Sequence, residues 1–283
     1  MSRVPLTLIG ESINDSVPST HALFEANDLA AITGLARSQS ELGADYIDVN
    51  VGPRPADFMA AVVRAVQTVT PKPLSIDSPD YALAAAGLAA CDPACGTPIL
   101  NSISPLRLEM FDLLQSHRFR PILLASENLI DGSESPCRTA EETYDAARLL
   151  LETARSHGLS NDDCIIDPGI APIGADTENN IHRLMGALRL IHDDPAFAGV
   201  HMSVGLSNFT VMLPSRCADG SPVKLPLANA FLTRAMPLGL DMIIGSAKLA
   251  YGALPEGHPA LRCFDDCLAL SDFDVLMRVQ EFY

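Results

Sequence analysis

The sequence predicts a single α/β domain, a (β/α)8 barrel over residues 1–283, and three observations support this prediction. Short runs of aliphatic and β-branched residues alternate with longer runs whose apolar residues recur at helical spacing. The alternation gives about eight β/α units, the number that such a barrel requires. The length of 283 residues also suits a barrel of roughly 250 residues. A doubly wound open sheet is the main alternative, but no glycine-rich dinucleotide fingerprint follows the first strand.

The predicted elements follow one another in β/α order along the chain. Leu29, Ile32 and Leu35 illustrate the helical spacing, and Gly43 follows their helix at a position that favours glycine. Strands are predicted at residues 6–9, 46–50, 74–77, 98–101, 121–125, 164–167, 201–204 and 241–244. Helices are predicted at residues 29–42, 58–69, 81–90, 106–116, 141–157, 181–192 and 225–238, and the remainder is helical with loops.

Charge and hydropathy exclude some classes of protein. The formal net charge of −16 repels phosphate backbones, so we expect no nucleic-acid partner. No apolar run approaches the roughly 18 residues of a membrane span. The first residues also lack the charged and then apolar layout of a signal peptide. The expectation is therefore a soluble, cytoplasmic protein with no membrane contact.

Cysteine usage does not indicate a disulfide framework or a metal centre. The seven cysteines are odd in number, and no export signal accompanies them. Cys91 with Cys95, and Cys263 with Cys267, have the spacing of metal-binding pairs, but neither pair has a third ligand at a fitting distance in the sequence. We interpret all of them as free thiols and expect this chain to bind no metal.

Small acids and amides follow most of the predicted strands. Active sites of (β/α)8 barrels lie at the carboxyl ends of the strands. The set holds no Lys, no His and no nucleophile beside a base, which argues against a catalytic triad or a His-rich zinc site. Asp and Asn side chains can instead bind the donor and acceptor edge of a flat heterocycle, such as a pterin. The residues are Asn14, Asp48, Asn50, Asp77, Asn101, Asp167 and Asn208.

Each of these residues also has a structural interpretation. Asp77, Asn101 and Asp167 precede predicted helices, where Asp and Asn are good N-caps. Asp48 and Asn50 alternate with apolar residues, so both point to the same side of their strand. A polar pair that faces a barrel interior is unfavourable unless it has partners. Because six strand ends are polar in the same way, a binding site is favoured over independent caps.

Six segments together resemble the pterin-binding methyltransferase family. This family includes methyltetrahydrofolate:corrinoid methyltransferases and the folate domain of cobalamin-dependent methionine synthase. The resemblance runs from about residue 8 to residue 270, with smaller similarities at 170–174, 178–180 and 239–242. The six segments are 9–14 (IGESIN), 47–50 (IDVN), 75–78 (SIDS), 100–104 (LNSIS), 166–168 (IDP) and 205–208 (GLSN).

The resemblance implies a dihydropteroate synthase-like barrel and a one-carbon transferase. The enzyme would move a methyl group between N5 of methyltetrahydrofolate, or of a related tetrahydropterin, and the cobalt of a corrinoid. Asn208 matches the residue that hydrogen-bonds N5 as positive charge develops there. The residues that match pterin-binding positions are Asp77, Asn101 and Asp167, of which Asp77 and Asp167 also match positions that can anchor a water network toward N5. Supporting contacts are expected from Asn14, Asp48 and Asn50, and Arg216 is assigned to a family arginine in the loop that follows.

Partners follow from the same resemblance. The chain has no Asp-x-His-x-x-Gly motif for corrinoid ligation, so the corrinoid is expected on a separate protein that binds transiently. Relatives are commonly homodimers, and we expect a homodimer here. Two departures from the family, an extra stretch at residues 217–222 and Gly245-Ser246 after the last strand, leave the exact pterin and the docking surface open.

Two other functions are also considered: a dihydropteroate synthase and a pterin-binding subunit without turnover. Dihydropteroate synthase is similar through residues 167–170 (DPGI), but it carries a Lys after a Gly-x-Ser element in its seventh strand. This chain has Asn208 and Phe209 there, which favours methyl transfer over C–N condensation. The third possibility is a pterin-binding subunit without turnover. The sequence does not set the direction of methyl transfer.

Overall fold

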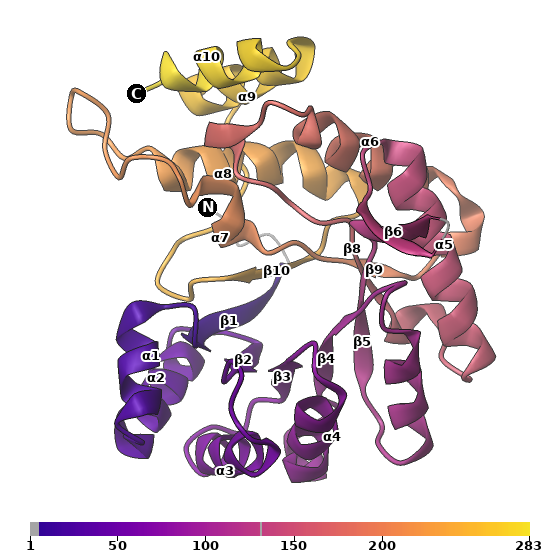
Figure 1. The fold of residues 1–283 in the computed structure, drawn as a ribbon. Helices are drawn as coiled ribbons and strands as arrows, with labels where there is room; N and C mark the ends of the chain where they lie inside the picture. Colours follow the sequence, from indigo (N-terminus) through magenta and orange to yellow (C-terminus); the bar gives the residue numbers. More distant parts are fainter. Residues whose placement is uncertain (1–5, 131) are drawn as a thin grey trace.

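The computed structural model describes residues 6–130 and 132–283, and its main feature is a sheet of eight parallel strands (Figure 1). The strand order is β10-β1-β2-β3-β4-β5-β8-β9. These strands are β1 (Thr7–Asn14), β2 (Tyr46–Asn50), β3 (Leu74–Asp77), β4 (Ile99–Ile103), β5 (Arg120–Leu124), β8 (Ile165–Asp167), β9 (His201–Met202) and β10 (Met242–Gly245).

The sheet closes between its first and last strands. Short bridges pair Met202 with Leu240 and Gly205 with Ile244. The backbone N–H of Asp241 donates to the carbonyl of Met202 at 3.2 Å, and that of Ile244 donates to Val204 at 3.0 Å. Since β10 also pairs with β1, the strands form a barrel. The predicted (β/α)8 fold is confirmed, and the doubly wound alternative is wrong.

Helices surround the barrel, and α9 and α10 lie beyond α8 on the side away from α3 and α4 (Figure 1). The first residues of several helices are set by capping side chains: Asp28 caps α2 and Asp80 caps α4. Thr139 and Glu142 form a capping box on α5. The helices are α1 (Pro18–Glu25), α2 (Leu29–Glu41), α3 (Ala56–Gln67), α4 (Tyr81–Ala90), α5 (Ala140–Ser156), α6 (Asn180–Asp193), α7 (Leu206–Thr210), α8 (Lys224–Ala235), α9 (Pro259–Ala269) and α10 (Phe273–Gln280). Within the described residues, no helix combines the length and the apolar character needed to cross a membrane.

Two apolar clusters form the core. The larger one packs the outer face of the strands against the helices. The smaller one fills the barrel interior with residues from different strands, as expected for this fold. Its members are Ile9, Ile99, Ile122, Ile165 and Met242. The polar residues at the strand ends lie further along the same strands, so the apolar layer forms a floor beneath them.

Several elements differ from the sequence prediction. The segment predicted as a helix at 106–116 is the 3-10 helix η2 (Leu108–Gln115), because apolar spacing cannot separate two helix types over so few residues. The sequence prediction did not include the short helices α1 and α7 or the hairpin of β6 (Glu127–Ile130) and β7 (Ser133–Pro136). All seven cysteines are free thiols.

Candidate active site

A cavity of about 830 Å³ opens at the carboxyl ends of the barrel strands. This volume is typical of a small-molecule site. The predicted residues that line it are Asn14, Asp48, Asp77, Asn101, Asp167 and Asn208, and other polar lining residues are Glu11, Ser12, Ser102, Ser126, Ser207 and Lys248. A second cavity of about 810 Å³ lies beside β1 and β10, but its lining is mainly apolar and contains no acid. The polar chemistry therefore belongs to the first cavity.

Asp48 and Asp77 form a pair of neighbouring carboxyl groups. Asn50 lies behind the pair, where its Nδ2 donates to Asp77 Oδ2 at 2.9 Å and its Oδ1 accepts from the N–H of Gly52. Burial raises the pKa of Asp77 to about 6, although the Asn50 amide opposes the rise. Burial and then the charge of Asp77 raise the pKa of Asp48 well above its ordinary value. Burial and the neighbouring carboxyl group therefore favour the protonated form of Asp48.

Asp48 also has a carboxyl oxygen without a hydrogen-bond partner in the described residues. The residue is 1% exposed, and its Oδ1 has no hydrogen-bond partner among the described residues. The same is true of Ser75 Oγ, on the neighbouring strand β3. Buried polar atoms normally have partners, and Asp48 lines the cavity, so its Oδ1 can accept a hydrogen bond from a ligand or from ordered water there.

Asp167 ends β8 in a tight turn. Its Oδ1 accepts from the N–H of Gly169 at 2.7 Å. Gly169 has a φ of +72°, and a Cβ there would lie 2.3 Å from Ser126 Cβ, so this turn requires glycine. Burial raises the pKa of Asp167 to about 7, while the Gly169 N–H and the charge of Arg183 act in the opposite direction. A carboxyl group that titrates near neutrality is typical of functional sites.

Asn208 lies on α7 and lines the same cavity. Its side chain is exposed and makes no hydrogen bond within the part of the chain that the structure describes. The preceding residue, Ser207, donates from Oγ to Glu11 Oε2 at 2.8 Å. Burial raises the pKa of Glu11, and the Ser207 hydroxyl partly offsets this. The Glu11–Ser207 hydrogen bond ties α7 to β1, so the free amide of Asn208 is held at the cavity.

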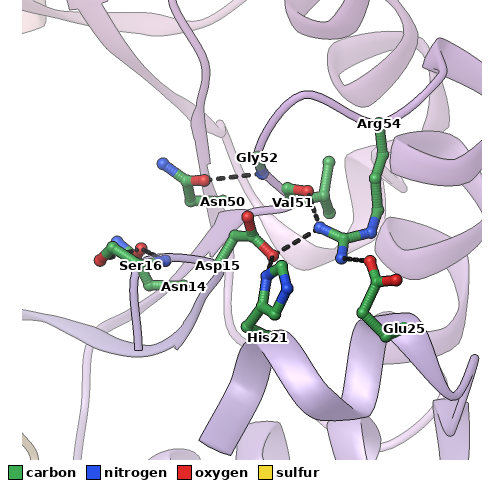
Figure 2. A network of polar contacts seen from close by, with 9 residues as sticks. All are labelled: Asn14, Asp15, Ser16, His21, Glu25, Asn50, Val51, Gly52 and Arg54. Carbon is green, nitrogen blue, oxygen red and sulfur yellow. Dashed lines mark hydrogen bonds and ion pairs between the residues drawn. The ribbon is translucent and has the colours of Figure 1, made fainter. Parts of the chain in front are cut away.

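A polar network fixes the rim next to β1 and β2 (Figure 2). The guanidinium of Arg54 donates to Asp15 Oδ1, to the carbonyl of Val51 at 2.6 Å and to Glu25 Oε1 at 2.6 Å. His21 Nδ1 lies 2.9 Å from Asp15 Oδ1. Because Glu25 and His21 belong to α1, the network joins this helix to the ends of both strands. Residues 17–20, which line the cavity, are thereby held in place.

The structure places the remaining predicted residues as follows. Asn14 lines the cavity, and its Oδ1 accepts from the N–H and the hydroxyl of Ser16 (Figure 2). Arg216 is exposed, donates to the carbonyl of Gly220 at 2.7 Å and is not one of the lining residues. Its loop, which includes the extra stretch at 217–222, is attached to the end of the chain by a hydrogen bond from Ala218 to Tyr283.

Sequence reasoning missed some residues of the site. Glu11 and Ser207 lie in motifs that the sequence singled out, but their mutual contact joins positions that are distant in the chain. Lys248 lies three residues after β10 and lines the cavity, so the expectation of a ring without Lys was wrong. In the residues that the structure describes, no group of three or more His, Cys, Asp or Glu could hold a metal ion.

Comparisons with known proteins agree with this geometry. A family model described as "Pterin binding enzyme" matches residues 13–245. The methylcorrinoid:tetrahydrofolate methyltransferase of Eubacterium limosum is 29% identical over 251 residues, which cover 84% of each chain. Two solved structures of Xanthomonas albilineans dihydropteroate synthase are similar in fold. The one with 4-aminobenzoic acid has a TM-score of 0.59 at 22% identity and covers 86% of this chain and 87% of its own. The one with 7,8-dihydropteroate has a TM-score of 0.57 at 18% identity and covers 95% and 94%.

Proposed function

The chain belongs to the pterin-binding enzyme family, and from this premise we propose that it is a one-carbon transferase. It moves a methyl group between N5 of tetrahydrofolate, or a related tetrahydropterin, and the cobalt of a corrinoid on a separate protein. The observation that carries the proposal is that Asp77, Asn101, Asp167 and Asn208 line one cavity. The name of the Eubacterium limosum relative supports this pair of substrates.

The acids and amides divide the work of binding the pterin. Ionised Asp167 accepts hydrogen bonds from the 2-amino and N3 edge, where charge-assisted bonds are strong. Asn101 can donate and accept at the ring amides. Asp48 and Asp77 complete the polar wall as a pair of neighbouring carboxyl groups. Asn14 and Asn50 support these contacts from the ends of β1 and β2.

Asn208 acts at the reacting nitrogen. When the methyl group leaves N5, that nitrogen must gain positive character before the bond breaks, and the pair of electrons stays on it. A hydrogen bond from the Asn208 side chain that strengthens only at this stage raises the rate rather than the affinity. In the opposite direction, N5 of tetrahydrofolate attacks the methyl group of the methylated corrinoid, the electron pair of the broken cobalt–carbon bond stays on cobalt, and N5 then loses its proton. Asp77 and Asp167, with pKa values of about 6 and 7, suit proton transfer through water near neutral pH.

The partner approaches the open end of the barrel. Apolar side chains lie on its rim: Val211 is 57% exposed and Met212 is 65% exposed, and Val17 and Val211 also line the cavity. Exposed apolar residues beside a site mark an interaction surface. A corrinoid protein that docks there transiently brings its cobalt to N5. The homodimer, which is expected from the resemblance, and the cytoplasmic location, which is expected from the composition, stay predictions.

Calorimetric titration tests the proposal. We expect micromolar-range binding of tetrahydrofolate or 5-methyltetrahydrofolate, and no binding of dihydropterin pyrophosphate. Binding of the pyrophosphate alone would instead indicate a dihydropteroate synthase-like condensation. Folate binding without methyl transfer in either direction would indicate a pterin-binding subunit. Asp77→Asn should weaken binding, whereas Asp112→Asn, on the surface of η2, should not.

A further inference from the structure

Arg183 is a buried arginine on α6 that contacts the turn after β8. The residue is 5% exposed. Its Nη1 donates to the carbonyl of Pro168 at 2.6 Å and to Thr143 Oγ1 at 3.0 Å. Its Nη2 donates to the carbonyl of Gly169 at 2.8 Å. The guanidinium therefore holds two consecutive carbonyls directly after Asp167.

The contacts of Arg183 do not account for its burial by themselves. A buried guanidinium is unfavourable unless its charge is compensated, yet its three hydrogen-bond acceptors are all neutral. Its Nε is buried and has no partner among residues 6–130 and 132–283. Burial lowers the pKa of Arg183, and the groups that oppose this are Cys137, Asp167 and Asp176.

Of these groups, Asp167 is the one that faces the cavity. Asp176 is occupied as the cap of α6, where its oxygens accept from the N–H groups of Asn180 and Ile181 at 2.9 Å each. Cys137 follows the β6–β7 hairpin and does not line the cavity. Arg183 is in turn the charged side chain that acts on Asp167. Asp167 is therefore the carboxylate through which the charge of Arg183 acts on the cavity, while Asp176 also compensates this charge.

We propose that Arg183 is a positioning residue that acts through Asp167. It fixes the Asp167-Pro168-Gly169 turn through the two carbonyls, and its charge favours the ionised carboxylate that accepts the pterin N–H groups. The inference rests on the proposed function for the identity of the ligand. Because burial already raises the pKa of Asp167 to about 7, loss of the guanidinium should raise it further and leave less carboxylate at neutral pH.

The test compares Arg183→Met with Arg183→Lys and with the control Arg155→Met. Arg155 also donates to neutral acceptors, Asn161 Oδ1 and the carbonyl of Ala196, but lies away from the cavity. The Kd for tetrahydrofolate is measured by anoxic calorimetry from about pH 6 to about pH 9. We expect Arg183→Met to raise Kd about fivefold at pH 7, because a rise of about one unit in the pKa of Asp167 lowers its ionised fraction there from about one half to about one tenth. Most of the affinity should be recovered at high pH. Arg183→Lys keeps the charge, so its pH midpoint should stay near that of the wild type.

Two results would overturn the inference: an unchanged pH profile in folded Arg183→Met, or the same midpoint shift in Arg155→Met. If Arg183→Met does not fold, Arg183→Lys tests the hydrogen bonds of the guanidinium to the turn. Loss of these bonds should weaken folate binding at every pH, and an unchanged affinity would reject the positioning role of Arg183. Wild-type protein that binds no folate would count against the proposed function instead. In that case, an NMR titration of ¹³C-labelled aspartate still tests whether the Asp167 midpoint rises in Arg183→Met.

Discussion

Asp167→Asn should make the protein more stable at alkaline pH while it weakens pterin binding. Asp167 is 6% exposed, and burial raises its pKa from 3.8 to about 7. A carboxyl group whose pKa is higher in the folded than in the unfolded state favours folding below the unfolded value. That benefit is lost as the pH rises through about 7. The shift corresponds to at most about 4 kcal/mol, at 1.36 kcal/mol per pKa unit, and water entry into the cavity reduces this to roughly 1–3 kcal/mol.

Asparagine removes the ionisation and keeps an oxygen to accept from Gly169. Thermal unfolding measured from about pH 5 to about pH 9 should show a gain in Tm of roughly 2–4 °C per kcal/mol at the alkaline end. The gain should shrink steadily as the pH falls from about 7 to about 5, and it should disappear only below the unfolded pKa of 3.8, where Asp167 is neutral in both the folded and the unfolded wild type. Binding of tetrahydrofolate should weaken by about 10- to 100-fold, since hydrogen bonds to charged groups contribute about 1.5–3 kcal/mol. A Tm difference that is absent, or that does not depend on pH, would refute this view of Asp167, and Asp112→Asn serves as the exposed control.

Three further predictions concern the turn after β8, the contact of His201 with Asp241 at the β9–β10 junction, and the apolar rim of the cavity. Gly169→Ala should destabilise the protein by several kcal/mol, because overpacking against Ser126 adds about 1–3 kcal/mol to the strain of a φ of +72°. The control Gly158→Ala, which has a φ of +86° but no atom within 4 Å of the added Cβ, should lose only the stability that the strain costs. Equal losses of stability in urea unfolding of the two variants would contradict this prediction. The hydrogen bond to Asp241 raises the pKa of His201. His201 therefore stabilises the fold below about pH 6.5 and loses this effect as the pH rises through its folded pKa. His201→Gln should lower the free energy of unfolding by less than about 1 kcal/mol at acid pH and leave it unchanged at alkaline pH. Met212→Glu should reduce the rate of methyl transfer with the corrinoid protein by about tenfold or more but leave folate binding unchanged. The control is Met277→Glu on α10, where Met277 is 42% exposed; it should affect neither the rate nor the binding.

The barrel was predictable because its strands and helices have strong periodicity. The alternation in β2 correctly indicated that Ile47 and Val49 pack outward while Asp48 and Asn50 face the interior. Helix α1 was missed because only Thr20 and Phe24 of its residues are buried, which leaves no apolar stripe. The hairpin of β6 and β7 was missed because its second strand, SESP, shows no alternation of apolar residues.

The properties of the site depended more on tertiary structure. The polar residues at the strand ends lie together because strand ends meet in any barrel, and this follows from the sequence. The raised pKa of Asp48 does not follow from the sequence, because it depends on burial next to Asp77. Arg183 falls within an amphipathic helix, where an arginine normally faces solvent, and only the contact of α6 with the turn after β8 buries it.

Methyl transfer between methylcobalamin and tetrahydrofolate under anoxic conditions tests the central claim most directly. The reaction is followed in both directions by the cobalt absorbance and by formation of 5-methyltetrahydrofolate, for the wild type, Asn208→Ala and the control Asn128→Ala. We expect turnover by the wild type and the control. Asn208→Ala should lower the rate by about 10²-fold or more while the Kd for folate changes far less. Wild-type protein that binds folate without transferring the methyl group, or Asn208→Ala with the wild-type rate, would contradict the account.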